Sequence, residues 1–600
     1  MYIRKTKTNS NKTKNYYSYR LVESVRTSSG KVAQKTLLNL GNNYSVIAEH
    51  EWPLLSDLIA SKLAGITPLF KASDAIDEEA DRLVNLIIGK HGNPMSSNTL
   101  GNKYYETVDV NSIDNTEVKS IGAEALAYET AKQLNLPAIL LTCGFNQKQL
   151  NMALGSVIGR LLSPGSEVVT ADYLRHKSAL DEVLGTDFSR LHRNQLYDIS
   201  DRLLKHKDQI ESKLFAQEKS CFQFEEVVTL FDLTNTYFEG QSKHNDNAAL
   251  GRSKEKRHDC MLVSLALVLD GSGFPKRSHI YQGNISEPST LEAMLQAVNK
   301  EAMVVMDAGI ATQENINWLT EHGYKYLVIS RKRNQVIPES IESVVVKEDS
   351  QNKVTSYLVN NELTQETELY CHSKTMEAKG KALQNRFQQR FIDELQKLAN
   401  GLSKKGCVKK YDKVHEKIGR LKEKYSKVAY AYEIEVIPDP TNKQVLEIKW
   451  QHHGKTQGKS SGIYCIRTNQ TQLTHHEIWQ TYRMLNDVEA AFRTLKTELG
   501  MRPIYHQQTD RVTGHIFISL LAYHLLHSIR FQLKNHGIND SWATIMSTLE
   551  NHYRITTAVQ RKDGKMLHVR KTMRANPRQL KIYQACQMPS MPLKTIVKSY

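Results

Sequence analysis

Two apolar, strand-like runs of the chain each lead into an aspartate, and this feature limits the folds that the chain can adopt. Asp232 interrupts the run that begins at 227–231, and Asp307 ends the run at 303–306. A carboxylate inside a buried strand is costly to desolvate unless a metal ion or a cation accompanies it. The two runs therefore predict a sheet that directs two acidic side chains toward one charged site.

The segments around the two aspartates indicate an α/β core. Apolar runs at 261–269, 278–283 and 324–330 have the length and composition of strands. Helical patterns at 288–300 and 313–322 flank the second aspartate. Strands that alternate with helices are typical of a sheet covered by helices.

A third acidic residue belongs to a helix that the sequence predicts at 475–499. Thr474 and Glu477 have the spacing of a capping box, and Gly500 is typical of a helix C-terminus. These signals predict one helix between them.

Glu489 lies in a polar column on this helix. Tyr482, Glu489 and Lys496 recur every seven residues, and seven steps of about 100° return to within roughly 20° of the first direction. Arg493 leans onto the same face, four residues after Glu489. The column suits a site that holds metal and phosphate. The alternative is a solvated face with a Glu489–Arg493 ion pair.

Asp232, Asp307 and Glu489 form the candidate catalytic and metal-binding set. All three offer carboxylate oxygens, which are the ligands that Mg²⁺ and Mn²⁺ prefer. We therefore expect Mg²⁺ or Mn²⁺ as the cofactor.

These residues lie in segments that resemble a bacterial insertion-sequence transposase of the DDE class. Its superfamily carries the signature Tyr-x2-Arg-x3-Glu-x6-Lys, and Tyr482, Glu489 and Lys496 fit that spacing. Leu485 stands at the arginine position, so the arginine contact to phosphate does not carry over directly. Other similar segments follow in the family order at 232–240, 251–259, 281–291, 304–312 and 502–526.

The resemblance implies an α/β fold with an RNase H-like catalytic core, an inserted helical-plus-β domain and mainly helical N-terminal domains. It also implies a DNA transposase in which two Mg²⁺ or Mn²⁺ ions support strand cleavage and strand transfer. The partners would be the terminal inverted repeats and the target, both double-stranded DNA. A homodimer would pair the two ends in cut-and-paste transposition.

DNA contacts follow from the same resemblance. Tyr482 and Lys496 would hold phosphate near the cleaved end. Arg483 and Arg493 are the basic residues closest to the position of the missing arginine, and both are candidate DNA-binding residues.

Trp450 is a further candidate DNA-binding residue, in the expected insertion. A tryptophan at a strand end can stack on an unpaired base. The competing interpretation places Trp450 in the core of a small sheet, because alternation puts it on one apolar face with Leu446 and Ile448.

Two other functions are compatible with the sequence. A DNA-binding protein of transposon origin that no longer cleaves would explain the basic ends equally well, but it would not need the acidic residues in the strands. A repair or RNase H-type nuclease would share the core chemistry, but it would leave the insertion and the basic ends unexplained.

Positive charge is concentrated at the two ends of the chain. Residues 1–43 contain nine Lys/Arg and one acidic residue, and residues 553–600 contain eleven and one. These two excesses together exceed the net charge of +16 of the whole chain. Basic ends on a near-neutral middle predict a polyanionic partner, commonly nucleic acid. General solubility is the alternative.

The interval between Asp307 and Glu489 is too long for a loop and predicts an inserted domain. It contains helical patterns at 375–403 and 408–427 and strand-like segments at 431–437, 444–450 and 462–468. We therefore expect a helical pair with a small sheet.

The expected boundaries divide the chain into six parts. They are a basic hairpin with helices for DNA binding (1–100), a helical bundle for DNA-end binding (101–220), the first part of the core (221–335), the insertion (336–474), the second part of the core with the glutamate helix (475–540) and a basic C-terminal segment (541–600). Within the first part we predict a hairpin at 16–39, helices at 48–64 and 76–90, and a linker at 91–102.

Several patterns argue against other kinds of site. The seven cysteines are scattered without a Cys-x-x-Cys motif, which fits reduced thiols rather than disulfides or zinc. Residues 454–460 resemble a phosphate-binding loop but have the wrong glycine spacing and precede a strand. The adjacent histidine pairs at 452–453 and 475–476 cannot share one helix face as zinc ligands do.

The most apolar stretch, 516–529, does not predict a membrane span. It is about 14 residues long and contains His524 and His527, so it is too short and too polar. We expect a buried helix packed on the catalytic sheet. The N-terminal residues lack the apolar core of a signal peptide, which favours a cytoplasmic, nucleoid-associated protein without a membrane partner.

Overall fold

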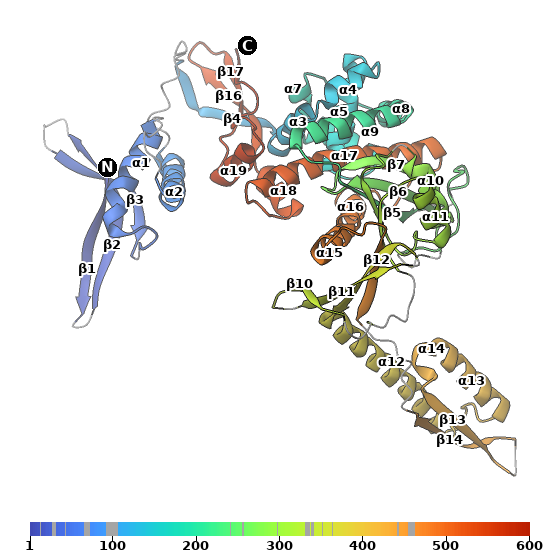
Figure 1. The fold of residues 1–600 in the computed structure, drawn as a ribbon. Helices are drawn as coiled ribbons and strands as arrows, with labels where there is room; N and C mark the ends of the chain where they lie inside the picture. Colours follow the sequence, from blue (N-terminus) through green and yellow to red (C-terminus); the bar gives the residue numbers. More distant parts are fainter. Residues whose placement is uncertain are drawn as a thin grey trace. The chain divides into compact units, whose positions relative to one another are not determined.

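The computed structural model describes the chain except for residues 12–13, 27–31, 43, 65–71, 92–105, 241, 255–256, 258, 297, 331–336, 338–340, 351, 363, 441–442, 454–461 and 600. The predicted hairpin turn, most of the predicted linker and the loop-like segment at 454–460 lie outside the described residues. The chain forms two compact units (Figure 1). The first contains Met1–Glu129, His176–Asp187 and Arg530–Tyr600, and the second contains Thr130–Arg175 and Phe188–Ile529.

The N-terminal part of the first unit is a three-stranded antiparallel sheet with two helices. The sheet has the order β1 (Tyr2–Asn11), β2 (Lys14–Arg26), β3 (Val32–Gly41), and η1 (Glu49–Glu51), α1 (Trp52–Ala64) and α2 (Asp74–His91) follow it. The predicted hairpin corresponds to β2 and β3, and the two predicted helices are confirmed. Strand β1 was not predicted. Leu21, Ile59 and Leu83 are fully buried and join the sheet to the helices.

A second sheet of the first unit joins segments that are far apart in the sequence. Its order is β18 (Ile596–Ser599), β17 (Met566–Thr572), β16 (Tyr553–Arg561), β4 (Val108–Ser120), and all pairs are antiparallel. Helices α7 (Leu180–Leu184), α18 (Trp542–Glu550) and α19 (Pro577–Ala585) belong to the same unit, and α3 (Gly122–Gln133) begins in it. The sequence did not predict these strands. The strand β4 pairs with β16, more than 400 residues further along the chain, whereas β16, β17 and β18 are close in sequence.

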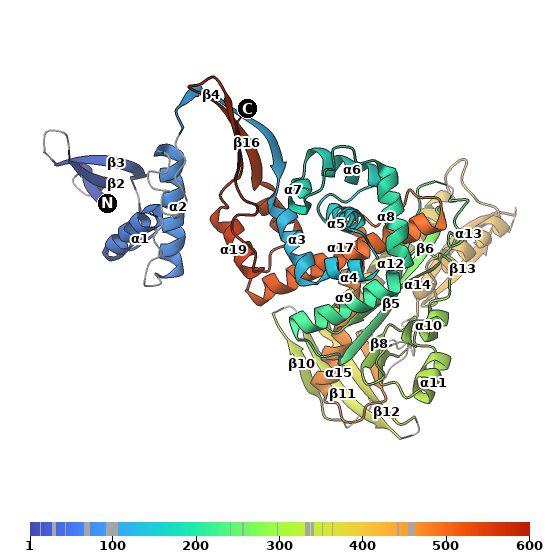
Figure 2. The ribbon, with the colours of Figure 1, turned by 90° about the horizontal axis from the view of Figure 1, so that it is seen from above.

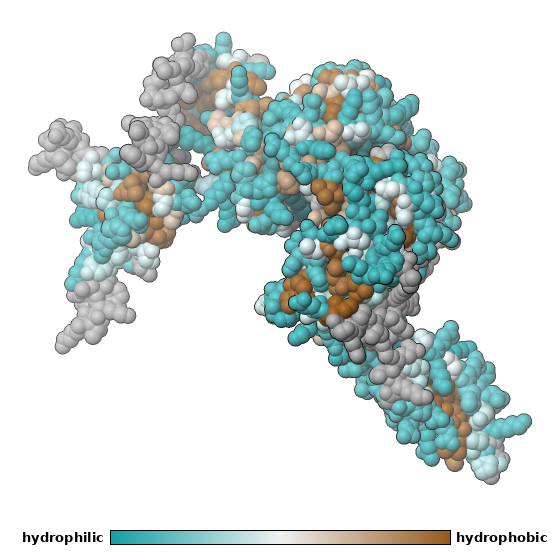
Figure 3. Space-filling model, in the orientation of Figure 1, coloured by the Kyte–Doolittle hydropathy of each residue, from teal (hydrophilic) through white to brown (hydrophobic). Residues whose placement is uncertain are grey.

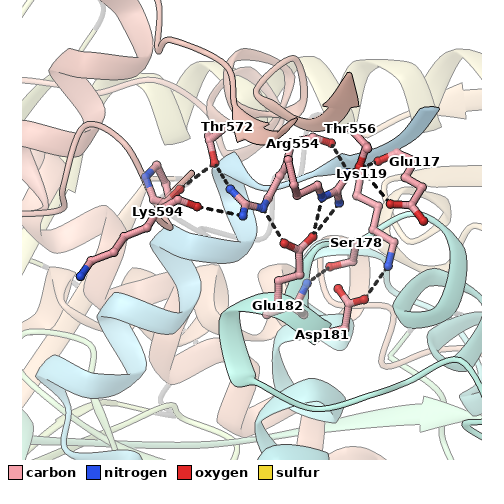
Figure 4. Close-up of polar contacts among 12 residues, drawn as sticks. Glu117, Lys119, Ser178, Asp181, Glu182, Arg554, Thr556, Thr572 and Lys594 are labelled. Atoms are coloured by element: carbon pink, nitrogen blue, oxygen red, sulfur yellow. Dashed lines mark hydrogen bonds and ion pairs between the residues drawn. The ribbon is translucent and has the colours of Figure 1, made fainter. Parts of the chain in front are cut away.

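A buried ion-pair network ties this sheet to α7 (Figure 4). Glu182 accepts hydrogen bonds from Arg554 Nε and Arg570 Nη2, each at 2.6 Å, and the Arg554 side chain is 1% exposed. Arg554 also donates to Thr572 Oγ1 at 3.1 Å and to the carbonyl of Lys594 at 3.0 Å. Burial raises the pKa of Glu182, but the two arginines outweigh burial and hold that pKa below its ordinary value. Two of the basic residues of 553–600, Arg554 and Arg570, therefore form ion pairs within the fold.

Replacing Glu182 with Gln should destabilise the protein by about 3 kcal/mol, because it leaves two arginines, one of them fully buried, without their counter-charge. The midpoint of urea unfolding measures the loss. The control is Glu416→Gln, which removes the acid of an exposed pair with Lys413 and Arg420 and should leave the midpoint almost unchanged, because water screens such a pair. Equal stability of the two variants would contradict a structural role for the network.

The second unit begins with a layer of helices. They are α4 (Leu136–Thr142), α5 (Gln147–Leu162), α6 (Glu167–His176), α8 (Arg193–Lys205) and α9 (Lys207–Phe222), which confirms the helical pattern of this region. Helix α5 is buried over nearly its whole length, and a capping box at Asn146 begins it. Helix α5 is therefore the buried centre of this layer.

A nine-stranded sheet forms the centre of the second unit (Figure 2). Its order is β10 (Val344–Glu348), β11 (Lys353–Asn361), β12 (Glu366–Ser373), β15 (Ile463–Thr468), β9 (Tyr326–Ile329), β8 (Met303–Met306), β5 (Val228–Tyr237), β6 (Leu262–Asp270), β7 (Pro275–Gln282). Strands β8 and β9 run parallel to β5, and the other pairs are antiparallel. The α/β class is confirmed.

The two faces of β5 have different partners. Phe231 and Leu233 belong to the apolar cluster that contains α10 (Leu291–Leu295) and α11 (Gln313–Glu321). Alternation along a strand then turns Asp232 toward the opposite face. A short 3-10 turn, η2 (Glu287–Thr290), precedes α10.

The predicted helical pair and a small sheet are present between β12 and β15. In contrast, most of 344–373, which the expected insertion at 336–474 included, forms β10 to β12 of the nine-stranded sheet. Helices α12 (Lys374–Gly401), α13 (Tyr411–Lys424) and α14 (Ser426–Ala429) pack on the two-stranded sheet of β13 (Tyr432–Pro438) and β14 (Val445–His452). The third strand predicted for this small sheet is wrong, because 463–468 forms β15 of the main sheet. Arg467 on β15 makes a bidentate ion pair with the buried Glu366 on β12, which fixes β15 in the main sheet.

The predicted single helix at 475–499 is two helices. They are α15 (His475–Arg483) and α16 (Leu485–Thr497), and the predicted capping box at Thr474 is present. At Met484 the amide bonds back to Thr481 and the carbonyl accepts from Asp487, so hydrogen bonds to the third residue tighten the turn. Helix α15 contacts β9 to β12 and β15, whereas α16 contacts β5, so each helix follows a different part of the sheet.

The apolar stretch at 516–529 lies in α17 (Thr509–Asn535). By length and composition α17 is the one helix of the described chain that could cross a membrane, but 89% of its most apolar window is buried. His524 bonds to Glu218 on α9 at 2.7 Å, and His527 bonds to the carbonyl of Ser272 at the β6–β7 turn at 2.9 Å. The prediction of a buried core helix is confirmed.

Figure 3 shows a mainly hydrophilic face with separate apolar patches.

Candidate active site

The pairing of β5 with β8 places the two predicted aspartates side by side. Phe231 lies opposite Met306 in the parallel register, so Asp232 and Asp307 are the next residues on neighbouring strands. Neighbouring strands are about 4.8 Å apart. The side chain of Asp232 is 18% exposed, and Asp307 lies at the exposed end of its strand. The two carboxylates therefore belong to one site.

Electrostatics connects these aspartates to the third predicted acidic residue. Burial raises the pKa of Tyr482 to about 12, and the negative charges of Asp307 and Glu489 add to the rise. Tyr482 on α15 therefore lies within electrostatic range of both carboxylates. Its ring also packs against Tyr464 on β15, with centroids 5.9 Å apart.

A lysine and a glutamate that sequence reasoning did not assign complete the acidic site. Lys254 Nζ lies 3.7 Å from Asp232 Oδ1, donates to Glu287 Oε1 at 2.9 Å and donates to the carbonyl of Leu233 at 2.6 Å. Burial raises the pKa of Asp232 to about 6. Lys254 opposes this rise, and Glu287 and Asp307 add to it.

Lys496 approaches the same carboxylate from α16. Burial and the positive charge of Lys254 lower the pKa of Lys496 to about 8, while Asp232 acts in the opposite direction. Asp232 thus interacts electrostatically with Lys254 from a loop and with Lys496 from α16. Lys496 is half-buried, so its ammonium would be poorly solvated without an anionic partner.

The two arginines of the helix pair lie in different surroundings. Arg483 stacks on the ring of Trp479, 4.9 Å from its centroid, and Trp479 donates to Tyr464 at 3.0 Å. Arg493 is exposed, and among the described residues it forms no ion pair with Glu489. The ion pair of the alternative interpretation is therefore absent among the described residues, whereas Glu489 and Arg493 are both exposed, as a solvated face requires.

Trp450 lies in the insertion and does not join these residues. It is half-buried, packs beside the core of the small sheet and lines an open groove of about 800 Å³ with Ile448. The predicted apolar face is wrong at Leu446, which is 63% exposed. A bulge opposite Ile437 and Pro438 leaves Leu446 unpaired and shifts the alternation.

The three predicted acids offer the donor type of a hard divalent ion, because Asp232, Asp307 and Glu489 supply only carboxylate oxygens. Their ligand atoms do not all lie within 4.8 Å of one another, so the structure brings Asp232 and Asp307 onto neighbouring strands but does not close the set with Glu489. Glu287 adds negative charge beside Asp232. Such a set suits Mg²⁺ or Mn²⁺ rather than zinc.

A second group of ligand type lies elsewhere in the same unit. Atoms of Glu167, His506 and His515 come within 4.8 Å of one another, the one such group of three in the described chain. Arg160 is buried against them, 3.1 Å from His515 Nδ1 and 3.9 Å from Glu167. A guanidinium at this position repels a metal cation, so we interpret this group as a buried hydrogen-bond and ion-pair network.

Lys254 and Glu287 stand in the segments 251–259 and 281–291, whose similarity to the family is the one signal in the sequence that points to them. Nothing in the sequence alone shows that the two segments meet beside Asp232.

Residues 223–525, half of the chain, match the family described as the transposase DDE domain. The chain therefore belongs to the DDE transposases. Residues 3–63 match the N-terminal domain of the IS1634 family of transposases, which identifies the type as that of a bacterial insertion sequence. No curated protein matches the chain. DDE transposases act on DNA and generally use divalent metal ions.

Gly309→Ala should weaken metal-dependent DNA cleavage severalfold without unfolding the protein. A Cβ atom at this position would lie 3.1 Å from Glu287 Oε2, so the Glu287 carboxylate beside Asp232 would have to shift, whereas the 3.9 Å distance to Asp307 Oδ2 is ordinary contact. The Mn²⁺ concentration that gives half-maximal cleavage measures the effect and should rise. Gly419→Ala is the control, because its Cβ meets nothing within 4 Å. An unchanged Mn²⁺ requirement would show that the site tolerates the shift.

Proposed function

We propose that the chain catalyses metal-dependent cleavage and strand transfer at the terminal inverted repeats of an insertion sequence, by a cut-and-paste route. The observation that carries the proposal is the β5–β8 register, which sets Asp232 beside Asp307. Helix α16, which carries Glu489, contacts β5. The family to which the chain belongs supplies the substrate class.

We further propose that the core is RNase H-like. The strand order β7-β6-β5-β8-β9 supports this assignment, with an antiparallel meander of three strands followed by two strands parallel to β5. The segment from α12 to β14 would be the insertion. The parts before the core, 1–100 and 101–220, would bind the DNA ends.

In this proposal Asp232, Asp307 and Glu489 hold two Mg²⁺ or Mn²⁺ ions. The ions, when bound, would activate water or a DNA 3′-hydroxyl for in-line attack and stabilise the departing oxygen. Tyr482 donates a hydrogen bond to the phosphate through its neutral hydroxyl, since its pKa of about 12 keeps it protonated. Lys496 adds a positive charge from α16. Arg483 and Arg493 contact the DNA backbone further along.

Asp232→Asn, Asp307→Asn and Glu489→Gln should each reduce Mg²⁺-dependent cleavage of terminal inverted-repeat DNA to background. They should leave binding to that DNA intact, because each variant removes a metal ligand and no phosphate contact. EDTA should stop the wild-type reaction, and added Mg²⁺ should restore it. The control is Glu321→Gln, an exposed acid on α11. Cleavage by any one of the three variants would remove that residue from the set.

A homodimer that holds two DNA ends is the expected assembly. Light scattering of the protein mixed with terminal DNA should give two chains and two duplexes per complex. A single chain that cleaves both strands of one end would contradict this part of the proposal.

Trp450 is proposed to stack on an unpaired base at the DNA end. Trp450→Ala should leave first-strand nicking unchanged and slow the second-strand step by about 1–3 kcal/mol of lost stacking. Ile448→Ala is the matched control on the same strand, because Ile448 is 4% exposed and its loss should lower stability instead. If Trp450→Ala lowers the melting temperature and slows every step together, Trp450 acts only in the core.

A further inference from the structure

A cleft of about 1040 Å³ opens beside the two aspartates and has no role in the chemistry described above. Its walls are the end of β5 at Leu233, Thr234 and Asn235, the loop at 251–254 and the segment at 283–288. Gly309, two residues after Asp307, also lines it. Lys254 and Glu287 lie on the boundary between the cleft and the acidic site.

The walls of this cleft depend on close backbone contacts. A Cβ on Gly251 would lie 2.5 Å from the carbonyl of Gly283, and a Cβ on Gly283 would lie 2.1 Å from the carbonyl of Leu262. The two loops can therefore meet only because both positions are glycine. Asn235 fixes one wall to β5, since its amide donates to the carbonyl of Arg252 at 3.0 Å and accepts from the amide of Lys254 at 3.2 Å.

The polar groups of the cleft suit a phosphate backbone. The guanidinium of Arg252 is exposed and, among the described residues, has no hydrogen bond or ion pair. Asn284 and Ser286 line the opposite wall, and their side chains make no hydrogen bond within the described part of the chain. Arginine, asparagine and serine side chains commonly hold phosphate and sugar oxygens of DNA.

The cleft and the glutamate helix lie on different sides of Asp232. Leu233, which lines the cleft, points to the α10 side of the sheet, whereas α16 with Lys496 covers the face of Asp232. If Tyr482 and Lys496 hold the transposon end, a strand that passes the acidic site must continue on the other side.

We propose that this cleft binds the sugar–phosphate backbone of the flanking DNA, just beyond the phosphodiester to be cleaved. Arg252 contacts a phosphate there, and Asn284 and Ser286 contact neighbouring backbone oxygens. This assignment rests on the proposed function, because it takes the cleaved phosphodiester to lie at Asp232 and Asp307.

The test compares two duplexes that carry the terminal sequence found beside the gene of this chain. One ends at the cleavage position, and the other continues for ten base pairs of flank. Binding of the full chain is measured by fluorescence anisotropy at several salt concentrations. Ca²⁺ replaces Mg²⁺ so that the DNA is not cleaved during the measurement.

The wild-type chain should bind the continuing duplex more tightly than the ended one. Arg252→Ala should weaken binding to the continuing duplex by about three- to tenfold and reduce its salt slope by about 0.9, with less than a twofold effect on the ended duplex. Ser286→Asp, which adds a negative charge to the cleft, should give the same selective loss. Lys325→Ala is the matched control, because Lys325 pairs with Glu301 before β9, at the opposite end of the strands from Asp307.

Equal losses on both duplexes, no loss on either, or a wild-type chain without preference for the continuing duplex would each overturn the assignment. The outcome is separate from that of the proposed chemistry. If Asp232→Asn still cleaves while Arg252→Ala shows the selective loss, the acidic set is wrong and the cleft still binds DNA. If Asp232→Asn fails to cleave and Arg252→Ala binds normally, the acidic set is correct and the cleft does not bind the flanking DNA.

Discussion

The parallel pairing of β5 with β8 is the contact on which the site depends. It brings together two aspartates that are 75 positions apart in the sequence, and it does so at the end of a short strand where Asp307 can reach solvent. Two adjacent carboxylates repel each other, and burial of Asp232 adds to the difficulty of keeping it charged. Lys254 offsets this repulsion in the protein alone, because its ammonium reaches both Asp232 and Glu287. The fold therefore holds a partly compensated acidic site that still has an excess of negative charge for a divalent cation.

The width of the sheet explains the shape of the helix that carries the third carboxylate. A nine-stranded sheet twists along its length, and one straight helix cannot follow both halves. The turn at Met484 lets α15 pack over the strands of the β9 to β12 side while α16 packs on β5. Tyr482 and Glu489 therefore lie on two different helices, although their spacing in the sequence is that of one helix face. The two residues nevertheless remain close enough to interact, because the negative charges of Asp307 and Glu489 raise the pKa of Tyr482.

The sequence was sufficient for features that depend on local patterns. The apolar runs predicted the core strands β5 to β9, the capping box predicted the start of α15, and two histidines in a short apolar stretch predicted that α17 is a core helix. Features that depend on distant partners were missed. Residues 463–468 are apolar enough for either sheet. Their partners in the main sheet are β9 and the unpredicted strand β12, which also supplies Glu366 as the ion-pair partner of Arg467. In the same way, Lys254 and Glu287 have ordinary surroundings in the sequence, and the backbone contacts of Gly251, Gly283 and Leu262 bring them to the acidic site.

Distant partners also determine how much of the positive charge of the basic C-terminal segment (553–600) is free to bind DNA. Arg554, Arg561 and Arg570 all count toward its positive charge, yet each pairs with an acid from another part of the first unit, either Glu182 or Glu106. A buried, paired guanidinium cannot release counterions from DNA, so charge counted along the sequence overstates the charge available for binding. Salt-dependent affinity must then come from cations that remain exposed, such as Lys571 and Lys598 on the same sheet. The arginines instead join β16 and β17 to α7 and to the residue Glu106 before β4, so their charge stabilises the fold that presents those lysines.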